Sequence, residues 1–142
     1  MKSKAPLALM EMLIMVAVFA FAAALCVSVF VKSSIYSAEG AARDRAVVEA
    51  ENAAELIRYY DGDLNAAAKV LGGEGSEEAL TVAYDADWKT GELKAETAFE
   101  LKAQIEESGT KGLGKAVIFV QDEKGRELFT IPVAWQIKAG ER

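Results

Sequence analysis

From Leu7 to Val31 the sequence is apolar except for one carboxylate, Glu11, and one hydroxyl, Ser28. As a helix rising about 1.5 Å per residue, this run reaches about 37 Å, enough to cross a hydrocarbon core of about 30 Å with some tilt. A buried helix of a globular domain can be equally apolar, but a chain of 142 residues has no second hydrophobic layer to surround it. The run therefore predicts a transmembrane helix over residues 7–31.

Charges on either side of the run predict its direction through the membrane. Lys2, Lys4 and the terminal amine precede it without a neighbouring acid, whereas mixed charges follow Lys32 from Glu39 onward. Because basic flanking residues stay on the cytoplasmic side, we expect the N-terminus inside the cell and everything after Lys32 outside. The expected location is the cytoplasmic membrane, with a single span and an extracytoplasmic C-terminal domain.

A cleaved secretory signal is the alternative interpretation of the same run. Its hydrophobic centre is usually shorter, about 7–15 residues, and its cleavage site is a small-x-small pattern in an extended segment. The candidate patterns at residues 20–22 and 22–24 lie in mid-run, with further apolar residues after them. A lipoprotein site at Cys26 is disfavoured because Leu25 stands where a small residue is needed. These observations favour a retained helix.

Composition excludes several classes of function. When Lys2, Lys4, Lys32 and Glu11 are set aside from the 16 basic and 22 acidic residues, 13 and 21 remain beyond position 32, a net charge of −8. That balance argues against binding nucleic acid or anionic headgroups, which need a basic surface. The only cysteine lies in the apolar run and there is no histidine, so disulfides, thiolate metal sites and histidine-based catalysis are excluded. We expect no enzyme activity and no cofactor.

Beyond Lys32 the apolar pattern continues along one side of the same helix. We expect one helix from about Pro6 to Tyr60, apolar all round in its first half and amphipathic over residues 32–60. Gly40 costs about 1 kcal/mol against alanine and is the expected point of bending. The apolar face recurs at steps of three or four: Ile35, Ala38, Ala42, Ala46, Ala50, Ala53, Ile57 and Tyr60. The charged residues are expected to be solvated: Glu39, Arg43, Asp44, Arg45, Glu49, Glu51, Glu55 and Arg58.

The small domain expected over residues 61–142 begins where this helix ends. Asp61-Gly62-Asp63 is a helix-ending sequence, and Asp63 is placed to cap a short helix over Leu64–Leu71. Gly72-Gly73 would end that second helix, and the acidic segment from Gly72 to Glu78 is expected to be a loop.

The period of the apolar residues then changes to two, which indicates strands. Asp122–Arg126 is a hairpin signal with a glycine available for positive φ. Pro132 cannot donate to a ladder, so its strand is expected at an edge or a bulge. The fold class is therefore α+β, a four-stranded antiparallel meander covered by the amphipathic half of the long helix. The expected strands are Leu80–Tyr84, Phe99–Glu106, Lys115–Gln121 and Glu127–Lys138, with a turn region from Asp85 to Glu96.

This organisation resembles the type IV pilin and pseudopilin superfamily. The sequence similarity is confined to Leu7-Ala8-Leu9-Met10-Glu11-Met12-Leu13-Ile14, which resembles the family's phenylalanine-threonine-leucine-isoleucine-glutamate opening. The alignment makes residues 1–6 a basic leader, Leu7 the first mature residue and Pro6 the residue before the cut. The family's leader ends in glycine or occasionally alanine, so Pro6 is a departure. The chain is also similar to small pilin-like membrane proteins of Gram-positive bacteria with a Pro-Leu-x-Leu-Met-Glu opening.

The resemblance implies a charge-pairing role for Glu11. A carboxylate in hydrocarbon costs about 3 kcal/mol, so it would pair with a neighbouring subunit's terminal amine or with a lysine such as Lys4. The alternative is a span from Met12 to Val31, with Glu11 at the inner headgroups. The alanines at residues 20 and 22–24 would allow another helix to approach closely in the membrane. The alternative is that they only give this part of the helix a low side-chain volume.

The function that the resemblance implies is non-enzymatic. The chain would be a structural subunit of a type II secretion, competence or type IV pilus-like assembly, its partners being membrane lipid and other pilin-like subunits. The alternative is a single-pass anchor whose outer domain binds a ligand or an envelope partner. A third hypothesis, a membrane-bound enzyme, is supported only by dispersed carboxylates.

Two other residue sets have a functional and a structural interpretation. Asp61, Asp63, Asp85 and Asp87 could bind calcium, but the spacing lacks the bidentate glutamate, so caps and turns are the expected roles. The aromatic residues could form a sugar-stacking platform, but they are scattered, so core packing is expected, with Trp88 over the core edge. These residues are Tyr59, Tyr60, Trp88 and Trp135.

Overall fold

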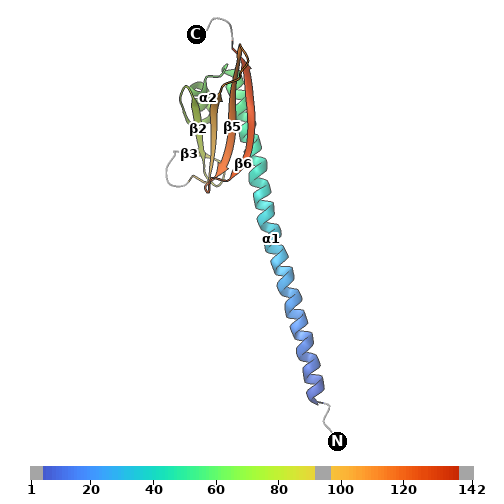
Figure 1. Cartoon of the computed structure of the whole chain (residues 1–142). Helices are drawn as coiled ribbons and strands as arrows, with labels where there is room; N and C mark the ends of the chain where they lie inside the picture. Colours follow the sequence, from blue (N-terminus) through green and yellow to red (C-terminus); the bar gives the residue numbers. More distant parts are fainter. Residues whose placement is uncertain (1–4, 92–96, 138–142) are drawn as a thin grey trace. The chain divides into compact units, whose positions relative to one another are not determined.

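The computed structural model describes residues 5–91 and 97–137 and divides the chain into two units, Met1–Gly40 and Ala41–Arg142 (Figure 1). Helix α1, Ala5–Tyr59, belongs to both units. Its bounds agree within one residue with the helix predicted from Pro6 to Tyr60. The basic leader up to Lys4, and the predicted end of the last strand at Lys138, lie outside the described residues.

In the first unit, α1 is exposed along its whole length. Every residue from Pro6 to Gly40 is exposed, including Ile35 and Ala38 of the predicted apolar face. The helix is uninterrupted at Ser28, whose hydroxyl donates a hydrogen bond of 2.8 Å to the carbonyl of Ala24. The only hydroxyl of the apolar run therefore has its acceptor in the same helix.

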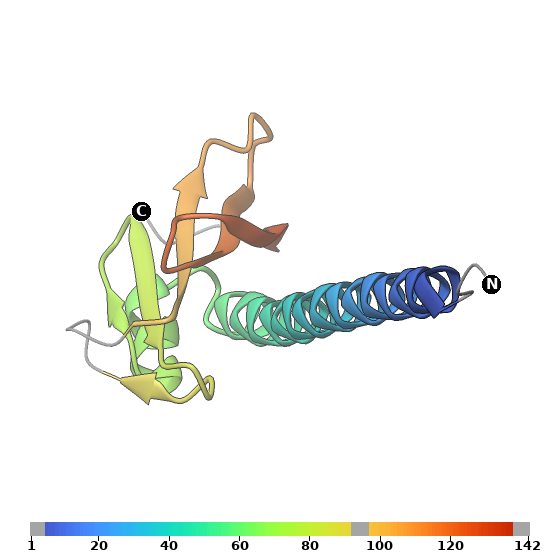
Figure 2. The ribbon, with the colours of Figure 1, turned by 90° about the horizontal axis from the view of Figure 1, so that it is seen from below.

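In the second unit, one antiparallel sheet carries the predicted meander. Its four long strands lie in the order β2-β4-β5-β6 and are joined in chain order (Figure 2). Since β6 is at the end of the strand order and, within the described part of the chain, pairs with β5 alone, Pro132 lies on an edge strand, as predicted. The strands are β2 (Ala79–Tyr84), β4 (Phe99–Glu106), β5 (Leu113–Asp122) and β6 (Glu127–Gln136).

The predicted α+β fold class is confirmed, but the strand number was wrong, because over residues 5–91 and 97–137 the sheet has six strands and not four. The two additional strands, β1 (Glu74–Gly75) and β3 (Thr90–Gly91), both pair with β2. They lie in segments that we predicted as a loop and a turn. Each has two residues, one of them glycine, so neither shows the alternation that indicates a strand.

Helix α2, Leu64–Leu71, has the predicted bounds and caps. A carboxylate oxygen of Asp63 accepts hydrogen bonds of 3.0 Å from the backbone N–H groups of Asn65 and Ala66. Gly72, at φ 74°, ends the helix in the left-handed conformation that glycine adopts without strain. Leu64 and two alanines of α2 are buried in the core.

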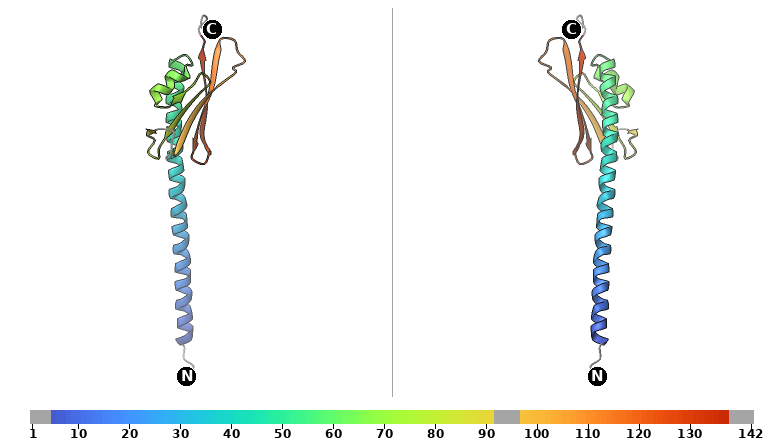
Figure 3. Two further views of the ribbon diagram at one scale, coloured as in Figure 1. Left: turned by 90° about the vertical axis from the view of Figure 1, so that its left-hand side faces the viewer. Right: turned by 90° about the vertical axis from the view of Figure 1, so that its right-hand side faces the viewer.

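The C-terminal section of α1 supplies one side of the core. Its buried residues are Ala46, Ala50, Ala53, Ala54 and Ile57, four of which belong to the predicted apolar face. Across from them lie side chains of one face of the sheet: Leu80, Val82, Leu101, Ala103, Ala116, Ile118, Val120 and Val133. This section of α1 and α2 lie on the same side of the sheet (Figure 3), so the predicted cover is confirmed.

Candidate membrane-spanning segment and its junction with the sheet

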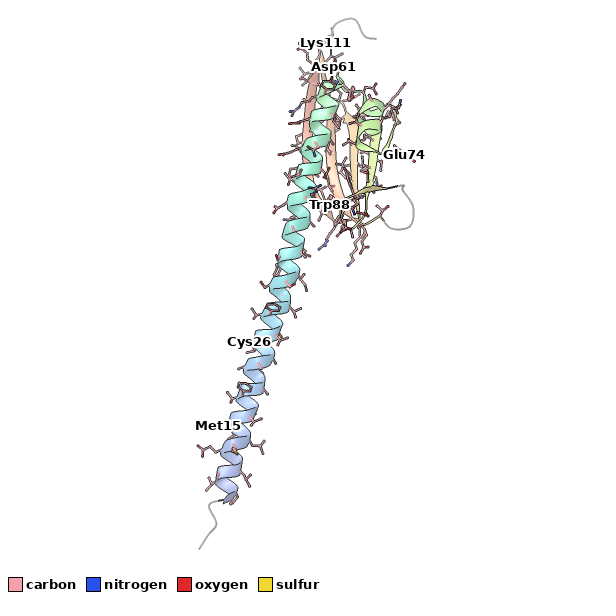
Figure 4. The ribbon with its side chains drawn as sticks, turned by 180° about the vertical axis from the view of Figure 1, so that it is seen from behind. Met15, Cys26, Asp61, Glu74, Trp88 and Lys111 are labelled. Atoms are coloured by element: carbon pink, nitrogen blue, oxygen red, sulfur yellow. The ribbon has the colours of Figure 1, made fainter. Side chains whose placement is uncertain are left out.

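The N-terminal section of α1 is long and apolar enough to cross a membrane, and none of its most apolar part is buried. Its large side chains project freely from the helix, as Met15 and Cys26 do in Figure 4. Phe19 and Phe30, for example, are 77% and 76% exposed. A core helix of a globular domain would bury such residues. Apolar surface on this scale indicates a segment that lipid or other apolar chains cover.

Glu11 lies in this exposed apolar section, one turn beyond Leu7. Pro6 stands in the first turn of α1, where its missing N–H leaves no hydrogen bond unmade. The pairing of Glu11 with Lys4 stays a prediction because Lys4 lies outside the described residues. Cleavage between Pro6 and Leu7 also stays a prediction.

The junction between α1 and the sheet holds a polar group that the sequence did not predict. The hydroxyl of Tyr84, on β2, donates a long hydrogen bond of 3.5 Å to one oxygen of Glu49. The other oxygen of Glu49 is paired at 3.1 Å with Arg45, one turn earlier. The side chain of Glu49 is only 12% exposed, so the prediction that it is solvated was wrong, whereas Arg45 is 52% exposed.

The environment of Tyr84 keeps its phenol protonated. Tyr84 is 2% exposed, and this burial raises the pKa of its hydroxyl well above the ordinary value. The negative charge of Glu49 and the hydrogen bond to it raise the pKa further. Tyr84 is therefore a permanent donor near neutral pH, and Glu49 is its acceptor.

Three of the four aromatic residues, Tyr60, Trp88 and Trp135, belong to the core or pack against it, and the four do not form a platform. Trp88 stacks on Phe99 at 4.2 Å between ring centroids and contacts Tyr84 at 5.6 Å. Trp135 is buried, and its ring lies against Gly62, next to Asp61 in the sequence. Figure 4 shows Asp61 and Trp88 at opposite ends of the domain. The core packing predicted for both tryptophans is confirmed. Tyr60 packs against the core, but Tyr59, which contacts Tyr60 edge to face, is 78% exposed, so the core packing predicted for Tyr59 was wrong.

Of the four aspartates predicted to form caps and turns, Asp63 and Asp85 accept backbone hydrogen bonds as predicted. One oxygen of Asp85 accepts the N–H groups of Asp87 and Lys89, both at 2.9 Å. Asp122 does the same for Lys124 and Arg126 in the β5–β6 hairpin. Over residues 5–91 and 97–137, no three histidine, cysteine, aspartate or glutamate side chains gather as a possible metal site.

An open hollow of about 700 Å³ lies beside α2. Its charged side chains, Asp63, Lys69 and Glu77, are of mixed sign, and Tyr60 and Val70 provide apolar wall. This mixture favours no particular class of ligand.

Comparisons with known proteins add no assignment: no family model, curated protein or solved structure matches the chain.

Proposed function

We propose that the protein is a pilin-like structural subunit, without enzymatic activity, that contributes to a type II secretion, competence or type IV pilus-like assembly. In this proposal the N-terminal section of α1 crosses the cytoplasmic membrane once, with the N-terminus inside. The domain formed by residues 61–142 is displayed outside the membrane.

The observation that carries the proposal is that the two sections of α1 have different surroundings. Over residues 7–31, about the length of a bilayer, the helix exposes apolar side chains with the exceptions of Glu11 and Ser28, and its C-terminal section buries alanines and Ile57 against a small antiparallel sheet. A helix that served only as an anchor would not need to be the main cover of the domain core. The opening around Glu11 supports the proposal independently, through its resemblance to the pilin opening.

The partners follow from the same features. The exposed apolar section would pack against lipid and against the corresponding helices of other pilin-like subunits. The net charge of −8 beyond position 32 supports an outer domain that does not bind nucleic acid.

Photo-crosslinking in the cells that make the protein tests this proposal. A photoreactive residue at Ala20, in the middle of the apolar section, should give adducts with the apolar helix of another pilin-like chain. The matched control places the same residue at Glu55, on the exposed side of the section that covers the sheet. We expect the adducts from position 20 to withstand mild detergent extraction and to be identified by mass spectrometry.

The opposite result would be a chain that crosslinks only to lipid and is monomeric in mild detergent. Such a chain that also bound a small molecule or glycan saturably would instead be an anchor for a binding domain.

A further inference from the structure

The face of α1 against the sheet changes in character along the helix. Ala46 and Ala50, the first two buried residues, each place a single methyl group in the core, whereas Ile57 is among the largest fully buried side chains. Alanines do not interdigitate with a facing sheet as larger side chains do. The first docked turns of α1 are therefore held less firmly by packing than the turn around Ile57.

The polar group formed by Arg45, Glu49 and Tyr84 lies at these weakly packed turns. Glu49 lies between Ala46 and Ala50 in sequence, and Tyr84 reaches it from β2. Because Tyr84 is almost fully buried, detaching this part of α1 leaves its hydroxyl without the carboxylate that accepts its hydrogen bond. Arg45 neutralises the charge of Glu49 from the exposed side.

We propose that Arg45, Glu49 and Tyr84 form a latch that controls whether the first docked turns of α1 stay on the sheet. With the latch broken, α1 separates from the sheet over residues 45–52 while the section around Ile57 stays packed. This inference goes beyond the proposed function and does not require that the chain assembles with others.

Hydrogen exchange of the full chain in detergent micelles, followed by mass spectrometry, tests the latch. Tyr84→Phe keeps the ring and removes only the donor, so amides of residues 46–52 should exchange about three to ten times faster. Amides of residues 54–59 and of β5 should change by less than about twofold, since their packing is intact. Tyr59→Phe is the matched control, because Tyr59 is 78% exposed, and it should change neither region.

A second variant separates the latch from a simple loss of packing. Glu49→Ala leaves the buried Tyr84 hydroxyl without its acceptor and should accelerate exchange at 46–52 more than Tyr84→Phe does. The double variant should then exchange more slowly than the product of the two single effects predicts, because the two residues act through one contact. Unchanged rates at 46–52 in Tyr84→Phe would overturn the proposal. So would equal acceleration at 46–52, at 54–59 and in β5, since that pattern is a general destabilisation.

Discussion

The indole ring of Trp135 lies directly against Gly62, so that a Cβ atom at position 62 would overlap the ring. Gly62 follows the end of α1 at φ 92°, a conformation that side chains rarely adopt. On the opposite strand, Gly114 pairs with Trp135 and would meet the same ring. Two glycines therefore make the space for one buried tryptophan, between the end of the helix and the sheet.

Gly62→Ala is expected to destabilise the domain by about 2–4 kcal/mol, because overlap with the indole and the positive φ act together. Urea unfolding of the full chain in detergent, followed by tryptophan fluorescence, measures the effect. Gly91→Ala is the control, since a Cβ there meets nothing within 4 Å. Equal midpoints for the two variants would contradict the packing described for Trp135.

Ile57→Ala is expected to cost about 2–5 kcal/mol, because Ile57 is fully buried where α1 covers the sheet. Val70→Ala, at a side chain that is 58% exposed, should change the unfolding free energy by less than about 1 kcal/mol. The same urea titration compares them. A small effect at position 57 would mean that α1 is not the main cover of the sheet.

Alkaline pH should weaken the fold through Tyr84. Its pKa is raised in the folded state by burial, so the unfolded chain loses this proton first and is favoured as the pH rises above about 10. The unfolding free energy should fall by about 1 kcal/mol per pH unit from this group, and be unaffected by it below that pH. Subtracting the pH profile of Tyr84→Phe isolates the effect, because lysines titrate in both proteins. Parallel profiles above pH 10 would argue against a buried phenol.

Glu11→Gln removes the charge in the apolar section and keeps the shape of the side chain. If Glu11 pairs with a partner's amine, the variant should associate about fivefold or more weakly in mild detergent, while thermal unfolding of the outer domain is unchanged. Glu51→Gln, at an exposed carboxylate of the same helix, is the control. Unchanged association would favour the alternative position of Glu11 at the inner headgroups.

The elements that the sequence predicted correctly are those whose apolar pattern repeats over many residues or whose ends carry a local signal. The recurrence of alanines up to Ile57 predicted the covering face of α1, and the Asp63 and Gly72 caps predicted α2. Alternation over Leu80–Tyr84 and Phe99–Glu106 predicted β2 and β4, and the hairpin signal at Asp122–Arg126 predicted β5 and β6 on either side of it.

The features that were missed depend on contacts between distant parts of the chain. β1 and β3 exist only because β2 offers two free edge segments to residues that have no strand pattern of their own. Glu49 looks solvated by its place on the helix, and only Tyr84, on another element, makes it part of the junction. The strand predicted from Lys115 begins at Leu113 in the structure, so Gly114 lies within β5, where the ring of Trp135 approaches it closely.

One labelling experiment tests most directly the proposal that α1 crosses the membrane once and leaves the sheet domain outside. In a Cys26→Ser background, Glu77→Cys places the only thiol on an exposed residue of that domain. Intact cells are treated with a membrane-impermeant maleimide, and the membrane fraction is then isolated. We predict full labelling of membrane-bound protein before lysis. Labelling only after lysis, or recovery of the protein without the membrane fraction, would contradict the account.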